Sequence, residues 1–438
     1  MTRYHETYWL FALMVNEMAG FFTSKSKNKL SLILAVTVLG LLVLGCTGGP
    51  AYQGWSGFAG QDGTLYFGSM DGRVFAINTA ARSQNLTFPS EGEWVFTIPV
   101  PTAPGGMCGP LGCAPAARPA TIYGTPAVAG NLVYVATYAS DGGRVFAIDP
   151  SARSQKEIFP ARYKEGKESE FKGEWSYPSG DNKPIGAVVG GPIVDEDTLY
   201  VGSSDGKLYA LDAVKGDERW TPFDTGGKIK IWTFPAVEDG VVYFSNYERK
   251  LFAVSSADGT PVWPKTMELP ASIASSPVVS GNTIFFGTFD NYLYAVNSAD
   301  GTEKWKFKGG NWFWSTPVVE DGVVYAGCLD HNIYAIDVST GKELWRFTAD
   351  DQIVSTPVLV DNLLVVASES GTVYMLKADS EKPEHEPVPV DASVKVPVRA
   401  PLYAEGNMVY VHASNRCVYA VDVQSGNTVW KFPYSDIK

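Results

Sequence analysis

The feature that most constrains this chain is a sequence pattern that recurs at intervals of roughly forty residues. One clear copy, residues 316–347, supplies four short β-branched and aromatic runs separated by turn residues. Asp321-Gly322 and Thr340-Gly341 stand at two of the turns, and Pro317 opens the first run, where a missing N–H costs least. The pattern predicts a four-stranded antiparallel blade.

Two independent markers count eight copies of this blade. The alanine of the third run, or the methionine that replaces it, stands at Ala76, Ala147, Ala210, Ala253, Ala295, Ala335, Met375 and Ala420. The proline of the inner run agrees from the second copy onward, at Pro126, Pro192, Pro235, Pro277, Pro317, Pro357 and Pro401. One blade cannot bury both of its faces, so it must lie between neighbours in a closed ring. We therefore predict an all-β fold, a single eight-bladed β-propeller spanning residues 55–438.

The repeat resembles that of the pyrroloquinoline-quinone (PQQ) enzymes, whose signature is Ala-x-Asp-x-x-Thr-Gly-x-x-x-Trp. Ala335, Asp337, Thr340, Gly341 and Trp345 match every fixed position of that signature. The outer-strand tryptophans are Trp94, Trp175, Trp220, Trp263, Trp305, Trp345 and Trp430. A wide indole can fill the wedge that opens between diverging blades, so we predict that these residues dock one blade on the next.

Some repeats depart from the pattern. Insertions around residues 80–92 and 150–173 lengthen the same hairpin in two adjacent blades, and we expect them to project side by side as a surface for a partner. A further insertion, residues 99–121, contains Cys108 and Cys113, which either form a local disulfide or remain two free thiols.

Repeat seven lacks the outer tryptophan and has three prolines between residues 377 and 390. Prolines discourage a regular strand. The outer edge of this blade is therefore either open to a strand added by another protein or an irregular solvated loop.

Aromatic residues precede three inner strands at equivalent positions, three residues ahead of the proline. Equivalent positions around a ring converge, so we expect these side chains at one mouth of the central channel, with Lys230 as a nearby charge. The candidate channel-mouth residues are Tyr123, Trp232, Trp312, Trp314 and Arg399. They either plug the wide axis of the ring or bind a peptide, a sugar or a flat ring.

The first 45 residues have the features of an export signal. Lysines at positions 25, 27 and 29 precede an apolar run, residues 30–45, that is short for a membrane span. The run ends in Val43-Leu44-Gly45-Cys46, which resembles the bacterial lipobox. This resemblance implies a cleaved signal peptide (1–45), lipidation of Cys46 and a tether (46–54). An uncleaved signal anchor is the alternative, and a start at Met18 would leave a more conventional leader.

The remaining motifs give no positive indication of catalysis. A formal charge of −12 without a basic cluster in the propeller argues against nucleic-acid binding. The sequence contains no haem-attachment motif, phosphate loop or Gly-x-Ser-x-Gly elbow, and it lacks the vicinal cysteine pair of quinone-dependent alcohol dehydrogenases. We interpret His331 and His412 as structural and Cys328 and Cys417 as small buried residues. No metal or cofactor is predicted, although the resemblance leaves PQQ with calcium open.

The repeats, the lipobox and the lack of catalytic motifs together resemble the BamB family of propeller lipoproteins, which belong to the outer-membrane β-barrel assembly machinery. The resemblance implies a non-catalytic, monomeric scaffold that binds membrane lipid through Cys46 and a protein partner in the cell envelope. Its location would be the outer face of the cytoplasmic membrane or the periplasmic face of an outer membrane. The alternatives are a PQQ-dependent oxidoreductase or a related subunit, and a propeller that senses a sugar or another small ligand.

Overall fold

The computed structural model describes residues 56–99, 120–139, 142–154, 159, 173–179, 182–227 and 229–437. The chain divides into two units, Met1–Tyr52 and Gln53–Lys438, and the described residues belong to the second. The predicted signal region, Cys46, Cys108 and Cys113 lie outside the described residues. Within the described ranges, no helix is long and apolar enough to span a bilayer.

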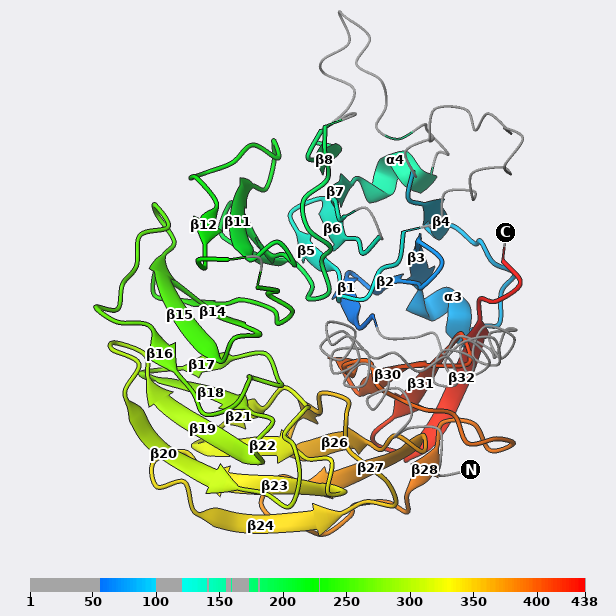
Figure 1. Ribbon diagram of the computed structural model, residues 1–438. Helices are drawn as coiled ribbons and strands as arrows, with labels where there is room; N and C mark the ends of the chain where they lie inside the picture. Colours follow the sequence, from blue (N-terminus) through cyan, green and yellow to red (C-terminus); the bar gives the residue numbers. More distant parts are fainter. Residues whose placement is uncertain are drawn as a thin grey trace, which may run out of the picture. The chain divides into compact units, whose positions relative to one another are not determined.

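The described residues form eight four-stranded antiparallel sheets, one for each repeat (Figure 1), which confirms the predicted fold. Blades 1 to 4 comprise β1(Phe58–Gln61), β2(Thr64–Gly68), β3(Arg73–Asn78), β4(Trp94–Thr97); β5(Ala127–Ala129), β6(Leu132–Ala136), β7(Val145–Ile148), β8(Trp175–Tyr177); β9(Ile193–Asp195), β10(Thr198–Gly202), β11(Lys207–Asp212), β12(Phe223–Asp224); and β13(Ala236–Glu238), β14(Val241–Asn246), β15(Lys250–Ser255), β16(Met267–Glu268). Blades 5 to 8 comprise β17(Val278–Ser280), β18(Thr283–Gly287), β19(Tyr292–Asn297), β20(Glu303–Lys308); β21(Val318–Glu320), β22(Val323–Gly327), β23(Asn332–Asp337), β24(Glu343–Thr348); β25(Val358–Val360), β26(Leu363–Ala367), β27(Thr372–Lys377), β28(Val388–Pro389); and β29(Tyr403–Glu405), β30(Met408–Ala413), β31(Cys417–Asp422), β32(Asn427–Pro433).

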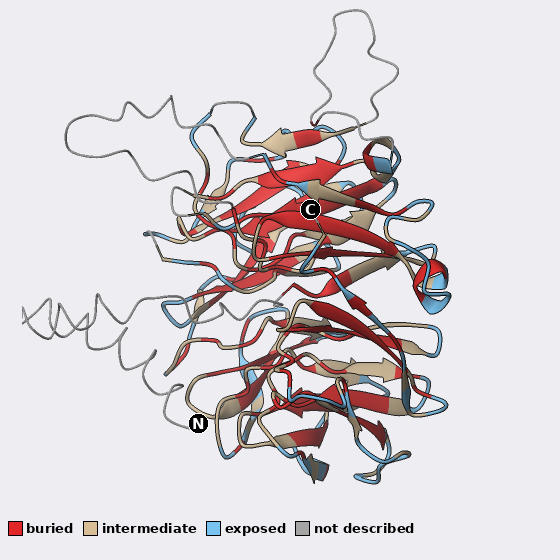
Figure 2. Ribbon diagram, turned by 90° about the vertical axis from the view of Figure 1, so that its right-hand side faces the viewer, coloured by how far each residue is buried: buried red, intermediate tan, exposed pale blue. Residues whose placement is uncertain are grey.

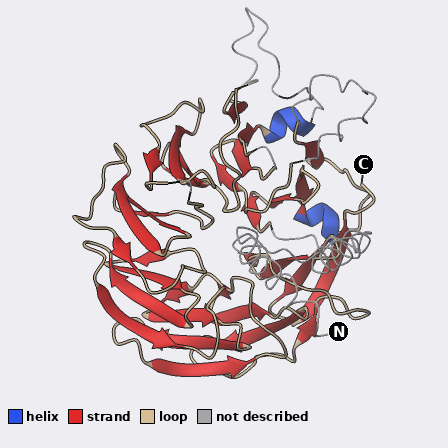
Figure 3. Ribbon diagram, viewed as in Figure 1, coloured by secondary structure: helices blue, strands red, loops and turns tan. Residues whose placement is uncertain are grey.

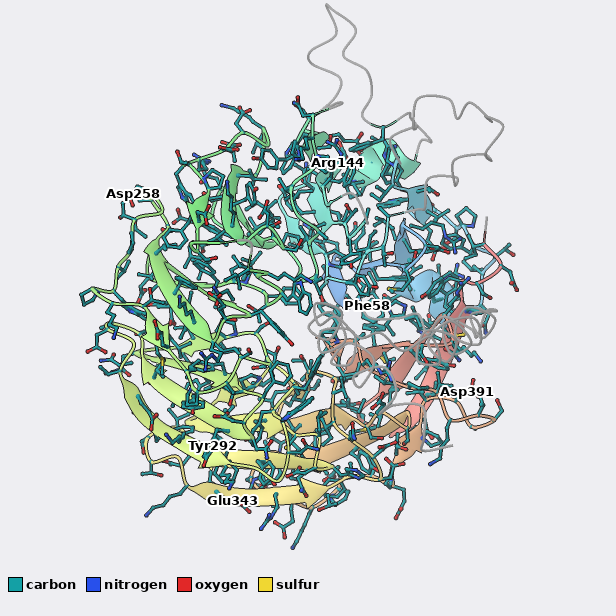
Figure 4. All side chains as sticks on the ribbon, viewed as in Figure 1. Phe58, Arg144, Asp258, Tyr292, Glu343 and Asp391 are labelled. Carbon is teal, nitrogen blue, oxygen red and sulfur yellow. The ribbon has the colours of Figure 1, made fainter. Side chains whose placement is uncertain are left out.

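The two central strands of each blade are buried on both faces. In β23, for example, the four residues Ile333–Ile336 are all buried, so the strand reads as a continuous apolar run rather than an alternating one. Figure 2 shows this burial along the strands, with exposed residues gathered at the turns. Figure 4 shows Phe58 on an inner strand and Glu343 on an outer strand at the rim. This burial on both faces is what blades packed between neighbours require.

Eight apolar clusters hold the ring together, and each joins two consecutive blades. The cluster that contains Phe67 of blade 1 and Val418 of blade 8 closes the ring. Burial of apolar surface is the main favourable contribution to folding, at about 25 cal/mol per Å². Because every blade depends on two neighbours, a defect at one joint should weaken the whole propeller.

Five of the outer tryptophans donate a hydrogen bond from indole Nε1 to a backbone carbonyl of the next blade. For Trp175, Trp220, Trp263, Trp305 and Trp345, the acceptors are the carbonyls of Ala213, Ser256, Ser298, Val338 and Ala378, at 2.8 to 3.3 Å. The indole of Trp305 also covers Gly341 so closely that a Cβ there would lie 2.6 Å from a ring carbon. Gly341 has a φ of +68°, so glycine suits this position for two reasons.

In blade 7, His385 occupies the place of the docking tryptophan. It follows Met375 by ten residues, the spacing that separates Ala335 from Trp345. The Nε2 atom of His385 lies 3.0 Å from the carbonyl oxygen of Val423 in blade 8. Because a carbonyl only accepts, Nε2 is the donor. The imidazole packs against Gly426 as the indoles pack against the equivalent glycines.

The outer strand of blade 7 is short but is not unusual in this molecule. Glu384 N donates to Met375 O at 2.8 Å, which holds the segment ahead of His385 against β27. Strand β28 then has two residues, as do β12 and β16. The open edge predicted for strand addition is therefore not a distinguishing property of blade 7.

The insertions of blades 1 and 2 share the motif Ala-Arg-Ser-Gln-x-x-x-Phe-Pro, at residues 81–89 and 152–160. Each begins within a short helix, α3(Thr79–Ser83) or α4(Pro150–Ser154) (Figure 3). The Arg82 and Glu93 side chains are 6% and 0% exposed and form an ion pair at 2.7 Å. Arg153 and Glu174 form the equivalent pair at 2.7 Å, with exposures of 4% and 6%. Burial raises the pKa of Glu174, although the Arg153 guanidinium opposes this effect.

Each of these arginines also packs on a phenylalanine from the outer strand of the preceding blade. The guanidinium carbon of Arg82 lies 5.1 Å from the ring centroid of Phe432, and that of Arg153 lies 5.0 Å from the ring centroid of Phe96. Each arginine also contacts a phenylalanine of its own insertion, at 5.7 Å for Phe88 and 5.5 Å for Phe159. We call these two units the arginine clamps. The described parts of both insertions thus pack on the neighbouring blade. Residues 155–158 and 160–172 of the second insertion lie outside the described residues, so the paired partner surface stays a prediction.

His412 lies at the joint where blade 8 meets the start of blade 1. The side chain is 1% exposed and lies among the rings of Phe58, Phe67 and Tyr434. Its Nδ1 atom is 2.7 Å from the carbonyl oxygen of Ser56, and its Nε2 atom is 2.6 Å from the Tyr434 hydroxyl. The carbonyl only accepts, so Nδ1 carries a proton. Burial lowers the pKa of His412 and so favours the neutral imidazole, in which Nε2 accepts from the Tyr434 hydroxyl at the joint of the ring ends.

This burial predicts a loss of stability in mild acid. It lowers the pKa of His412 from 6.5 to about 4. Between these pH values the unfolded chain binds a proton that the folded chain excludes, so the free energy of unfolding should fall by about 3 kcal/mol as the pH is lowered across that window. Thermal unfolding of the wild type and His412→Gln across this range would measure the difference. His331→Asn is the matched control, because residue 331 has a φ of +74° that asparagine tolerates. An equal pH dependence in wild type and His412→Gln would contradict this account.

Candidate functional site

The aromatic side chains singled out from the sequence lie at one end of the blades. In an antiparallel meander, the hairpin between the second and third strands and the connector to the next blade share the same end of the sheet. Trp232 lies on the connector to β13, and Trp312 and Trp314 lie on the connector to β21. Backbone bonds fasten these connectors to the hairpins of the same blades, for example from Tyr247 N to Lys230 O at 3.0 Å and from Leu329 N to Trp312 O at 2.9 Å.

Five aromatic residues on this face form a continuous series of ring contacts. Trp232 contacts Tyr247 at a centroid distance of 5.2 Å, and Tyr247 contacts Phe289 at 6.3 Å. Phe289 contacts Trp312 at 4.9 Å and Trp314 at 5.7 Å. We call Trp232, Tyr247, Phe289, Trp312 and Trp314 the aromatic strip. The strip crosses the connectors and hairpins of blades 4, 5 and 6.

The strip is accessible at one end. Trp232 and Tyr247 are 37% and 41% exposed, whereas Phe289, Trp312 and Trp314 are half-buried. The Lys230 ammonium lies 4.8 Å from the centroid of Trp232 and forms a cation–π contact with it. Large exposed aromatic side chains are uncommon on the surface of a monomer and are enriched where proteins bind partners. The strip is thus the strongest candidate for a binding surface in the described molecule.

The other two candidate mouth residues contact hairpins of blades 2 and 7. Tyr123 packs edge-to-face on Tyr138 of blade 2 at 5.3 Å, and burial raises its pKa. Arg399 forms an ion pair with Glu369 of blade 7. No ring contact between described residues joins Tyr123 to the strip. Three of the five predicted mouth residues, Trp232, Trp312 and Trp314, belong to the aromatic strip.

Two members of the strip, Tyr247 and Phe289, were missed by the sequence analysis. Both stand at the same place in the repeat, the hairpin after the second strand, where Leu329 stands in blade 6. Their shared position in the repeat could have identified both residues, because it places each hairpin residue beside the connector that leads into its own blade.

The titratable groups elsewhere do not form a metal site in the part of the chain that the structure describes. No group of three or more His, Cys, Asp and Glu side chains converges there. Cys328 and Cys417 are buried thiols, and burial raises the pKa of Cys328 to about 12. A thiol held in its protonated form is a weak nucleophile.

The fold and its joints define the class of protein. The eight four-stranded blades, four of which dock through an outer-strand tryptophan that lies over a glycine turn of the next blade, make a β-propeller of the PQQ-repeat type. The chain belongs to the family described as outer membrane protein assembly factor BamB, whose family model matches residues 47–223, 223–328 and 308–431.

Two solved structures share the fold of this chain. BamB from Moraxella catarrhalis has 16% sequence identity and a TM-score of 0.57, with 82% of this chain and 90% of that chain covered. The computationally designed protein Ika8 has 13% identity and a TM-score of 0.59, with 83% of this chain and 94% of that chain covered. No curated protein sequence matches this chain. At these identities, the two structures support the fold alone.

Proposed function

We propose that this protein is a non-catalytic, lipid-anchored scaffold of the cell envelope that binds a protein partner of outer-membrane protein assembly through its aromatic strip. The observation that carries the proposal is the strip itself, a continuous set of rings of which Trp232 and Tyr247 are more than one-third exposed. Membership of the BamB family supports the class of partner. The lipobox at Cys46 supports the anchor.

The location of the strip suits a scaffold. Its residues lie on connectors and hairpins that the rigid sheets hold in place, so binding requires little ordering of the surface. Aromatic side chains provide large contact areas for a small loss of side-chain entropy, which is why Trp and Tyr dominate interface hot spots. A partner would therefore derive most of its affinity from a few of these rings.

A crosslinking and pull-down experiment from native membranes tests the proposal. The wild type should recover a subunit of outer-membrane protein assembly, identified by mass spectrometry, and Trp232→Ser/Tyr247→Ser should recover at least about tenfold less of it, as expected when hot-spot residues are removed. Leu344→Ser is the matched control, because Leu344 is 52% exposed on the outer strand of blade 6 and lies outside the strip.

Recovery of redox subunits, or equal recovery by the wild type and the double variant, would contradict the proposal. Melting temperatures of all three proteins would show whether the substitutions leave the fold intact. An absorbance change on titration of the purified wild type with PQQ and calcium would favour the oxidoreductase instead.

A further inference from the structure

We propose that the aromatic strip binds an extended polypeptide segment in which apolar and polar side chains alternate and in which one carboxylate meets Lys230. The inference rests on the proposed function and specifies the ligand of the same site. It follows from the spacing of the rings, their orientation and the position of the one ammonium group beside them.

The spacing of the rings is close to the repeat of an extended chain. Successive centroids along the strip are 5.2, 6.3 and 4.9 Å apart, from Trp232 through Tyr247 and Phe289 to Trp312. In an extended strand, side chains on one face recur about every 6.5 Å. Alternate side chains of one peptide would therefore meet the two exposed rings, Trp232 and Tyr247, and the half-buried Phe289 and Trp312 would extend the apolar surface beyond them. The intervening side chains would point to solvent.

The orientation of the rings favours side chains over sugars. The interplanar angles along the strip are 57°, 65° and 86°, so the rings present faces and edges in turn. Rings at these angles to one another offer no continuous flat face, which a stacked sugar needs, whereas apolar side chains can contact both faces and edges. Lys230 covers one face of Trp232, the most accessible indole of the strip, and keeps a sugar from stacking on that face.

The charges at the end of the strip favour a carboxylate. Lys230 is exposed and forms no ion pair with a carboxylate of the described residues. The nearby Arg249 guanidinium donates to the carbonyl of Pro270 at 3.2 Å. The chain carries a net charge of −12, so most of its surface repels an acidic peptide. An acidic residue would thus be attracted at the Lys230 end and would set the position of the peptide on the strip.

Fluorescence anisotropy of labelled eight-residue peptides tests this proposal on the purified propeller. One peptide has leucines at alternate positions and a glutamate at an end, and a second has the same composition with the leucines in one block. A third replaces the glutamate by lysine. The alternating acidic peptide should bind about tenfold more tightly than the blocked one. It should bind about two- to fivefold more tightly than the lysine peptide, the range expected for an exposed ion pair.

Two variants give the result its specificity. Lys230→Glu should reverse the preference between the glutamate and lysine peptides, and Tyr247→Ser/Phe289→Ser should remove the preference for alternation. Equal binding of the alternating and blocked peptides, or tighter binding of a glycan oligomer such as chitohexaose, would overturn the inference. If peptide binding fails while the membrane pull-down still depends on the strip, only this inference fails. If the pull-down also fails, the proposed function fails with it.

Discussion

Replacing Arg82 by methionine is expected to destabilise the propeller by about 3 to 5 kcal/mol, the cost of removing one partner of a buried ion pair. Glu93 would remain fully buried without its cation, and the contact of Arg82 with Phe432 of blade 8 would be lost. A decrease of about 4 to 6 °C in the melting temperature corresponds to this loss. Calorimetry of the purified variant measures it.

The control for this prediction is an ion pair of similar length at the surface. Lys306 and Glu303 lie 3.2 Å apart with side chains that are 40% and 41% exposed. Lys306→Met should therefore change the stability by about 1 kcal/mol or less. Arg82→Met/Glu93→Gln should recover part of the loss, because no charge is left buried. A loss in Arg82→Met no larger than that in Lys306→Met would show that the arginine clamp does not hold the ring.

Replacing Trp345 by alanine is the second large effect, with an expected loss of about 3 to 5 kcal/mol. The indole is 9% exposed in the joint between blades 6 and 7, and its Nε1 donates to Ala378 O at 3.3 Å. The change removes a large buried surface and leaves a cavity between the blades. Thermal unfolding of the variant, compared with wild type, measures the effect.

Two further variants separate packing from hydrogen bonding at this joint. Trp345→Phe retains most of the packing and loses the hydrogen bond, so it should cost about 1 to 3 kcal/mol. Leu344→Ala changes the adjacent residue, which is 52% exposed, and should stay within about 0.5 kcal/mol of wild type. If Trp345→Ala and Leu344→Ala unfold at the same temperature, the outer tryptophans are not docking residues.

The blade count was predictable because the alanine and proline markers report local requirements of each strand. Ala335 sits in a strand buried on both faces, and Pro317 precedes a three-residue inner strand. Such local patterns recur in every blade and can be read without knowledge of the ring. The spacing of ten residues between Met375 and His385 was also present in the sequence. It remained unused because histidine does not resemble the indole that it replaces.

The contacts that depend on two blades were harder to foresee. The two copies of the Ala-Arg-Ser-Gln motif can be recognised in the sequence, because the same residues recur at the same positions within each copy. However, Phe432, the ring on which Arg82 packs, lies 350 residues further along the chain. The grouping of Trp232 with Phe289 requires the path of each connector over its own blade. Equivalence around the ring predicted that Tyr123 and Arg399 would lie near this group, but it did not predict their contacts with Tyr138 and Glu369 of the adjoining hairpins.

Site-specific photo-crosslinking in native membranes tests the central claim most directly. A photoreactive amino acid would replace Tyr247 in the aromatic strip or, as a control, Leu344 on the rim, which is exposed to a similar degree. We predict that a single envelope protein, a subunit of outer-membrane protein assembly, crosslinks at position 247 and not at position 344. The same products at both positions, or none at position 247 while the protein is folded and membrane-bound, would contradict the account of the strip as the partner-binding surface.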